Sequence, residues 1–198
     1  MATSIIKNRK QQIHHTAKNL FRERGYAATS MRHIAGELGI EAASLYSHIK
    51  SKEEILQLIC FELAEQFLKS SDELQRKKLP AKELFRQAVT EHIRIITQNM
   101  DSSVVFLHEW RHLSEPFISD FKLMRKRYEN FYKNIIRAGE RENSFKYQNE
   151  NLTVFVIFSA MNGIYEWFTP KGKLQPEEIA EQMVEVFLNG ILKNTSRQ

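Results

Sequence analysis

The sequence has little cysteine, proline or glycine. Its 198 residues include 1 cysteine, 4 prolines and 7 glycines. The single cysteine, Cys60, excludes an internal disulfide framework and is typical of a reducing, cytoplasmic location. The scarcity of proline and glycine, together with the lack of sustained alternation between polar and apolar residues, predicts an all-α fold.

Long apolar runs and catalytic motifs are also missing. No segment reaches the roughly 18 uninterrupted apolar residues of a transmembrane helix, and no signal peptide follows the basic N-terminus, so we expect no membrane partner. Without a glycine-rich phosphate loop, a paired-carboxylate site or a nucleophile elbow, we expect neither an enzyme nor a bound cofactor. The segment HEWRH, residues 108–112, matches the zinc-protease pattern H-E-x-x-H. No third ligand follows at a recognised spacing, so we expect no metal site.

The positive charge is concentrated near the N-terminus. The chain has a formal net charge of +5, and residues 1–52 alone hold nine Lys or Arg and three acids. The remaining residues are close to neutral, with 20 basic and 21 acidic side chains. Such a bias is expected of a domain that binds a polyanion, although a solvated basic face has the same composition.

Two short amphipathic helices, separated by a break at Gly39, fit residues 29–54, and either Thr29 or Ser30 is the expected cap of the first. The second, about residues 42–48, turns Leu45 and Ile49 inward and leaves small residues on its other faces. A helix this short needs bracing by its neighbours and can approach another surface closely. Helix-turn-helix proteins place such a helix in the DNA major groove. An ordinary corner of a helical bundle has the same spacing.

The pattern T-S-M-R-H-I-A-x-x-L-G-I-x-x-x-S-L-Y-x-H-I-K-S-K-E resembles the DNA-binding region of the TetR/AcrR family of bacterial regulators. With the preceding helix, the resemblance covers roughly residues 7–60. It implies a helix-turn-helix domain of three helices at residues 1–52 and a C-terminal helical effector-binding and dimerisation domain at residues 53–198. Glu41 and Ala43 depart from the commonest pattern, which has serine and then glycine or proline there.

The chemistry of the motif predicts which residues contact DNA. Thr29, Tyr46 and Lys52 offer hydroxyl or ammonium groups to phosphates, which positions the protein without reading sequence. Arg32 reaches a phosphate or a guanine edge, and Ala42, Ala43 and Ser44 are candidates for contact with thymine methyls or base edges. Because the two alanines cannot form hydrogen bonds through their side chains, base specificity should depend on Arg32, Ser44 and Glu41. The predicted DNA-binding residues are Thr29, Ser30, Arg32, Glu41, Ala42, Ala43, Ser44, Tyr46, Ser47, His48, Lys50 and Lys52.

Apolar spacing also predicts helices elsewhere in the chain. One covers residues 103–112, a second covers about 81–99 and carries His92 among its apolar residues, and a third covers 5–24 with an apolar stripe made of Ile13, Ala17, Leu20 and Phe21.

The last two predicted helices, about 152–168 and 176–194, are apolar and contain small residues that allow close approach. We expect them to form a two-fold dimer interface, and the family resemblance implies the same four-helix arrangement. The alternative is a helix pair within one chain. The predicted interface residues are Phe155, Ser159, Gly163, Met183, Phe187, Gly190 and Ile191.

Aromatic residues in the C-terminal domain are candidate walls of an effector pocket, although each is also a candidate core residue. The segments EWRHL, RYENFY and MNGIYEWFTPKGKLQPEEIA resemble TetR-like regulators of fatty-acid and acyl-CoA metabolism. That resemblance implies an acyl-CoA or related effector, with apolar drugs or aromatic acids as alternatives. The arginines 111, 125 and 127 are candidates for pairing with the effector's phosphates. The predicted ligand-binding residues are Phe106, Trp110, Arg111, Phe121, Arg125, Tyr128, Phe155, Phe158, Asn162, Tyr165 and Trp167.

The sequence therefore predicts a homodimeric repressor that binds double-stranded DNA at a palindromic operator and is released by a small hydrophobic effector. The competing hypothesis is a non-regulatory helical dimer whose basic domain binds an acidic protein. The slope of DNA affinity against salt concentration separates the two.

Overall fold

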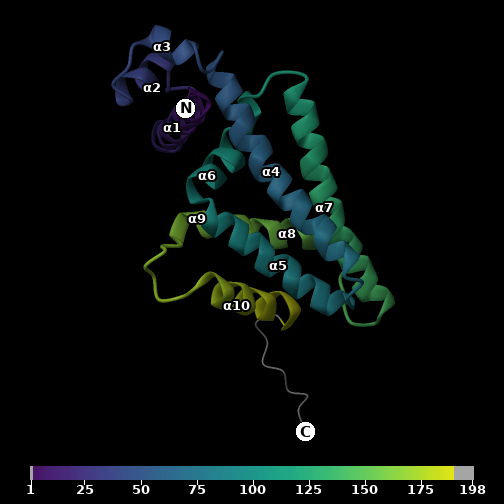
Figure 1. The fold of residues 1–198 in the computed structure, drawn as a ribbon. Helices are drawn as coiled ribbons and strands as arrows, with labels where there is room; N and C mark the ends of the chain where they lie inside the picture. Colours follow the sequence, from purple (N-terminus) through teal and green to yellow (C-terminus); the bar gives the residue numbers. More distant parts are fainter. Residues whose placement is uncertain (1, 190–198) are drawn as a thin grey trace. The chain divides into compact units, whose positions relative to one another are not determined.

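The computed structural model describes residues 2–189, with side chains from residue 9 onward, and this part of the chain is all-helical (Figure 1). The predicted all-α fold class is confirmed. Within the described range, no helix combines the length and the apolar character needed to cross a membrane. The helices are α1 (Ala2–Arg24), α2 (Met31–Glu37), α3 (Ala42–Tyr46), α4 (Lys52–Arg76), α5 (Ala81–Gln98), α6 (Met100–His108), the 3-10 helix η1 (Trp110–His112), α7 (Phe117–Arg141), α8 (Glu150–Asn162), α9 (Ile164–Trp167) and α10 (Pro176–Asn189).

The chain forms two compact units. The first comprises Met1–Glu65 and Asn99–Leu123, and the second comprises Gln66–Gln98 and Met124–Gln198. The helix-turn-helix segment therefore shares a unit with α6, η1 and the start of α7. The sequence suggested a different boundary, at residue 52, between a DNA-binding domain and an effector-binding and dimerisation domain. That boundary stays a prediction.

In the first unit, α1 packs against α2 and α6. The predicted apolar stripe of α1 is buried, because Ile13, Ala17, Leu20 and Phe21 recur on one face of the helix. Tyr26 follows the end of α1, and its ring meets Phe21 edge-on at 5.1 Å between centroids. Tyr26 is half-buried, and this contact holds the segment after α1 against that helix.

In the second unit, α10 runs beside α5, which also contacts α8 and α9 (Figure 1). The buried Tyr132 of α7 donates a hydrogen bond to the Ala88 carbonyl at 2.9 Å. As predicted, α10 begins at Pro176, whose missing N–H costs nothing in a first turn.

Two predicted helices have different bounds in the structure. The expected helix at 152–168 is interrupted at Gly163, which ends α8 before α9 begins. The expected helix at 103–112 starts earlier, at Met100, and its α-helical part ends at His108. Glycine lowers helix propensity at the first site. At the second, the chain tightens into η1, as helix ends often do.

Candidate nucleic-acid interface

The helix-turn-helix is held by local hydrogen bonds. Ser30 is the N-cap of α2 and accepts from the His33 backbone N–H at 3.1 Å, while His33 Nδ1 accepts from the Ser30 N–H at 3.3 Å. This reciprocal pair satisfies two backbone donors at the start of α2. Gly39 has φ +64°, the left-handed conformation that ends a helix without steric cost. The sequence predicted both the cap and the turn, but not the role of His33.

Helix α3, the second helix of the motif, is anchored by two buried side chains, Leu45 and Ile49. These leave the opposite face open, as predicted. Among the predicted DNA-binding residues, Ala42 and His48 are half-buried. The exposed ones are Ser30, Arg32, Glu41, Ala43, Ser44, Tyr46, Ser47 and Lys50.

The prediction that Thr29 offers its hydroxyl to a phosphate is wrong. Thr29 is 1% exposed, and its Oγ1 donates to the carbonyls of Gly25 at 2.9 Å and Leu20 at 3.3 Å. A hydroxyl has one proton to donate, and here it is directed into the protein. Thr29 therefore supports the loop before α2 instead of facing DNA.

Lys52, predicted to contact a phosphate, has partners inside the protein, and the phosphate contact stays a prediction. Its Nζ donates to the carbonyls of Tyr26 and Thr29, both at 2.7 Å, and lies 4.0 Å from the centroid of the Tyr26 ring. Partial burial lowers the pKa of Lys52, and the nearby Glu109 carboxylate opposes that shift. The ammonium group thus holds the chain between α1 and α2 to the start of α4.

Three contacts within the first unit join the helix-turn-helix region to the segment 99–123. The Glu53 carboxylate accepts from Ser114 Oγ at 2.6 Å and from the Ser114 N–H at 2.8 Å, which lowers the pKa of Glu53. The Tyr26 ring stacks on His112 with centroids 5.1 Å apart. Arg22 forms an ion pair with Asp101. The sequence analysis missed all three, because their partners are far apart in the chain.

The HEWRH segment does not present two histidines on one α-helical face. Helix α6 ends at His108, and His112 belongs to η1, where its Nε2 lies 3.4 Å from Glu109 Oε2. Within the range that the structure describes, no group of three or more His, Cys, Asp or Glu residues is arranged to hold a metal ion.

The predicted ligand-binding residues fall into both units. In the first unit, the Phe121 ring lies 5.3 Å from Phe106 and 5.7 Å from Trp110, so these three aromatic residues form one cluster. Arg111 is exposed and places its guanidinium 4.6 Å from the centroid of the Trp110 ring. The cluster is a continuous part of the core of this unit.

In the second unit, the predicted residues Tyr128, Phe158 and Asn162 surround a buried histidine, His92. His92 Nδ1 lies 3.2 Å from the Tyr128 hydroxyl, and its Nε2 lies 3.2 Å from Asn162 Oδ1. A neutral ring protonated at Nε2 satisfies both partners. Burial lowers the pKa of His92 to about 3. The sequence placed His92 on the inward face of its helix but gave no sign of these partners.

Four predicted ligand-binding residues of the second unit lie outside this cluster. Phe155 and Trp167 are 68% and 54% exposed, so the single chain does not enclose them, and their place in a ligand pocket stays a prediction. Tyr165 and Arg125 are half-buried. The neighbouring Arg127 is held by both oxygens of Asp72 at 2.7 Å, so its guanidinium already has an acidic partner.

An exposed apolar stripe runs along α8. Phe155 and Ser159 of the predicted dimer interface lie on this stripe, together with Leu152 and Val156. On α10, Phe187 turns toward Phe85 of α5, with ring centroids 6.1 Å apart, whereas Val186 is 54% exposed. Of the remaining predicted interface residues, Gly163 and Met183 are half-buried, and Gly190 and Ile191 lie outside the described residues.

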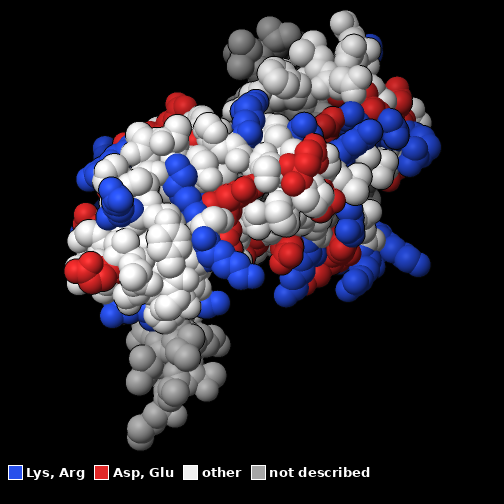
Figure 2. Space-filling model, turned by 90° about the horizontal axis from the view of Figure 1, so that it is seen from above, with Lys and Arg blue, Asp and Glu red and all other residues white. Residues whose placement is uncertain are grey.

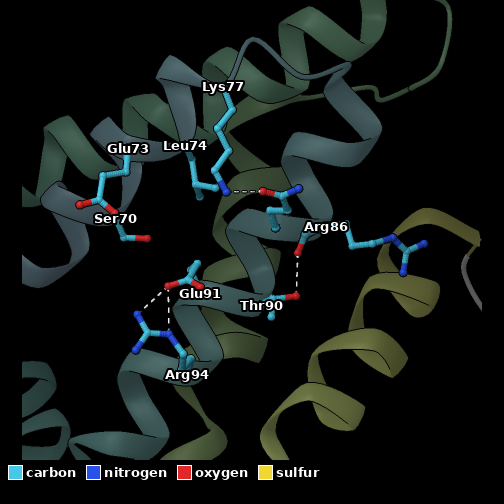
Figure 3. Close-up of a pocket in the computed structure, with 9 residues that line it drawn as sticks. Ser70, Glu73, Leu74, Lys77, Arg86, Thr90, Glu91 and Arg94 are labelled. Atoms are coloured by element: carbon cyan, nitrogen blue, oxygen red, sulfur yellow. Dashed lines mark hydrogen bonds and ion pairs between the residues drawn. The ribbon is translucent and has the colours of Figure 1, made fainter.

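A polar pocket of 540 Å³ lies between α4 and α5 in the second unit (Figure 3). Lys77 Nζ donates to Gln87 at 2.9 Å, and Arg94 pairs with Glu91 at 2.6 Å. None of the predicted ligand-binding residues lines this pocket. Its walls are Ser70, Glu73, Leu74, Lys77, Arg86, Gln87, Thr90, Glu91 and Arg94.

Charged side chains are mixed on the face that Figure 2 shows. Lys and Arg are interspersed with Asp and Glu there, without one broad basic area.

Known proteins resemble this chain over nearly its whole length. Residues 13–59 match the family model for bacterial regulatory proteins of the tetR family, and residues 78–191 match the tetracyclin repressor-like C-terminal domain. The chain is 24% identical over 195 residues to the HTH-type transcriptional repressor KstR2 of Rhodococcus jostii (strain RHA1), covering 96% of this chain and 94% of that protein.

Two solved structures share the fold at higher identity. The TetR family transcriptional regulator PfmR from Thermus thermophilus is 28% identical with a TM-score of 0.81, covering 92% of this chain and 96% of that one. AibR in complex with isovaleryl coenzyme A and operator DNA is 26% identical with a TM-score of 0.79, covering 91% and 98%. These matches agree with the resemblance seen in the sequence.

Proposed function

Because the chain belongs to the TetR family of DNA-binding transcriptional repressors, a family of regulators and not of enzymes, we propose that it binds a palindromic operator as a homodimer through α2 and α3. The observation that carries this proposal is the shape of α3. Leu45 and Ile49 hold the helix from below, while the exposed residues opposite them are small or polar. Such a face fits the major groove, where base edges are read.

Selection of bound sequences from random DNA tests operator binding. We expect an enriched palindrome whose half-sites are about 34–36 Å apart, or a multiple of that spacing, because a two-fold dimer places its recognition helices on one face of the duplex. Arg32→Ala and Ser44→Ala should relax base preference within that site. Binding without any enriched sequence would refute the proposal and favour non-specific attraction by the basic residues.

The dimer is proposed to form through the exposed stripe of α8 and the outward face of α10. The stripe consists of exposed apolar or small residues on one face of α8, namely Leu152, Phe155, Val156 and Ser159. A contiguous exposed apolar surface of this kind is typical of a protein–protein interface. Leu152→Glu should therefore shift the protein from dimer to monomer in analytical ultracentrifugation. The matched control is Leu123→Glu, since Leu123 is 69% exposed against 60% for Leu152 but lies on α7. Equal behaviour of both variants would place the interface elsewhere.

The effector is proposed to be an acyl-CoA whose acyl part binds at the His92 cluster. Support comes from the AibR complex with isovaleryl coenzyme A and from the cluster itself. The cluster combines aromatic walls with a few polar groups, which is the usual composition of a small-molecule site. Its histidine is neutral at physiological pH and suits an uncharged carbonyl better than a carboxylate.

Calorimetry with acyl-CoAs of several chain lengths, with free fatty acids and with coenzyme A alone tests the effector. We expect binding only when acyl chain and thioester are present together, and weaker operator binding once the site is filled. Asn162→Leu should reduce that affinity, whereas Thr90→Val, in the polar pocket, should leave it unchanged. Loss of binding in Thr90→Val alone would move the effector to the polar pocket, and no heat with any acyl-CoA would remove this effector class.

A further inference from the structure

The outward face of α3 has an apolar centre. Successive helical residues are about 100° apart, so the positions two before and two after the buried Leu45 lie about 200° around from it. These positions are Ala43 and Ser47, and both are exposed. Ser47 continues the helical conformation as the C-cap of α3.

The hydroxyl of Ser47 is already used inside the helix. Ser47 Oγ donates to the Ser44 carbonyl at 2.7 Å, so its proton is directed back along the chain. Ala43 has only a methyl group. The centre of the face therefore presents a methyl group and no free side-chain donor, and Ser47 Oγ retains only its acceptor capacity.

Polar side chains lie to either side of this centre. Ser44 and Tyr46 are each about 100° from Leu45, on opposite flanks, and both are exposed. Ala42 is about 60° from Leu45 and is half-buried, so only one of the two alanines faces outward.

We propose that Ala43 is a specificity-determining residue that reads thymine through its 5-methyl group, and that each operator half-site has a thymine opposite the centre of α3. Thymine alone among the four bases carries a methyl group in the major groove, and alanine is one of the side chains that contact it. The inference rests on the operator binding proposed above and adds the class of base that the site recognises.

Substitution of deoxyuridine for single thymines in the selected operator tests this assignment, because it removes only the methyl group. Burial of one methyl group corresponds to about a fourfold change in affinity. At one thymine position of the half-site, replacement in a single half-site should therefore weaken wild-type binding about fourfold, and replacement in both half-sites about 15-fold. Ala43→Gly should abolish most of this difference. Ala42→Gly is the matched control for helix propensity. Because Ala42 is also a predicted DNA-binding residue, this variant is expected to change overall affinity, but it should keep the difference between thymine and uracil.

The outcomes separate this inference from the operator proposal. An enriched palindrome in which the wild-type protein accepts uracil at every thymine would overturn the role of Ala43 and leave operator binding intact. Equal loss of discrimination in Ala42→Gly and Ala43→Gly would do the same. The absence of any enriched site would overturn operator binding and, with it, the base assignment. The uracil series with wild-type protein needs no variant to fold.

Discussion

Replacing Lys52 by methionine distinguishes its two candidate roles. Methionine keeps an unbranched side chain of similar length and removes the charge. If Lys52 holds the protein together, as its hydrogen bonds to the Tyr26 and Thr29 carbonyls indicate, then Lys52→Met should lower the free energy of unfolding. If Lys52 instead contacts a phosphate, the salt dependence of DNA binding should fall.

The expected loss of stability follows from the contacts. A hydrogen bond to a charged group contributes about 1.5–3 kcal/mol, and a cation–π contact at an exposed site contributes about 0.5–1 kcal/mol. Because Lys52 is only half-buried, we take the lower part of these ranges and expect a loss of about 2–3 kcal/mol. For a protein of this length, that corresponds to a decrease in Tm of about 4–12 °C. Lys52→Arg keeps the charge and should lose less.

Two measurements are compared for each variant: thermal unfolding, and operator affinity over a range of salt concentrations. The control is Lys50→Met, because Lys50 is exposed two residues away. Each phosphate contact contributes about 0.9 to the log–log slope, so Lys50→Met should flatten the slope with little change in Tm. Lys52→Met should lower Tm with the slope unchanged. A flattened slope at unchanged Tm in Lys52→Met would refute the structural role.

Three further predictions concern buried polar groups and the recognition helix. Because the folded pKa of His92 is about 3 against 6.5 for an ordinary histidine, its neutral form stabilises the fold above pH 6.5, and this contribution is lost as the pH falls toward 3. Between pH 6 and 5 the unfolding free energy of wild type should fall by about 1 kcal/mol more than that of His92→Gln, measured by denaturant titration; equal slopes would contradict the burial of a neutral ring. Thr29→Val should lower stability by about 1–2 kcal/mol without changing the salt slope, and a changed slope would return Thr29 to the DNA surface. Ser47→Ala should leave operator preference unchanged in a repeated selection, because the hydroxyl donates to Ser44, and an altered consensus would show that Ser47 reads a base.

The sequence located the helix-turn-helix because its signals are local. The cap at Ser30, the turn at Gly39 and the inward pair Leu45 and Ile49 all lie within a few residues of what they specify, and the structure confirms them. Apolar spacing likewise placed the core face of α1. Such signals depend on helical periodicity alone, which is readable without knowing the tertiary structure.

The sequence did not reveal contacts of polar and aromatic residues whose partners are distant in the chain. A lysine at the start of a helix suits either a phosphate or a carbonyl, and Lys52 donates to the carbonyls of Tyr26 and Thr29, which lie 26 and 23 positions before it. Aromatic composition also did not distinguish Phe155 from Phe158. They are three residues apart on α8, yet Phe155 is exposed and Phe158 packs on His92 and Tyr132. Only the helices packed around them determine which ring is covered.

The internal use of Thr29 and Lys52 has a consequence for how the recognition segment distinguishes DNA. In residues 29–52, the exposed cations are Arg32 and Lys50, so this segment supplies few of the phosphate contacts on which non-specific affinity depends. What remains on α3 is a face with a methyl group at its centre and hydroxyl groups at its flanks. The methyl contact proposed at that centre adds discrimination that does not depend on charge, beside the base preference expected of Arg32 and Ser44. The sequence preference of the segment should therefore be less sensitive to salt than its overall affinity, since the methyl contact involves no counterion release.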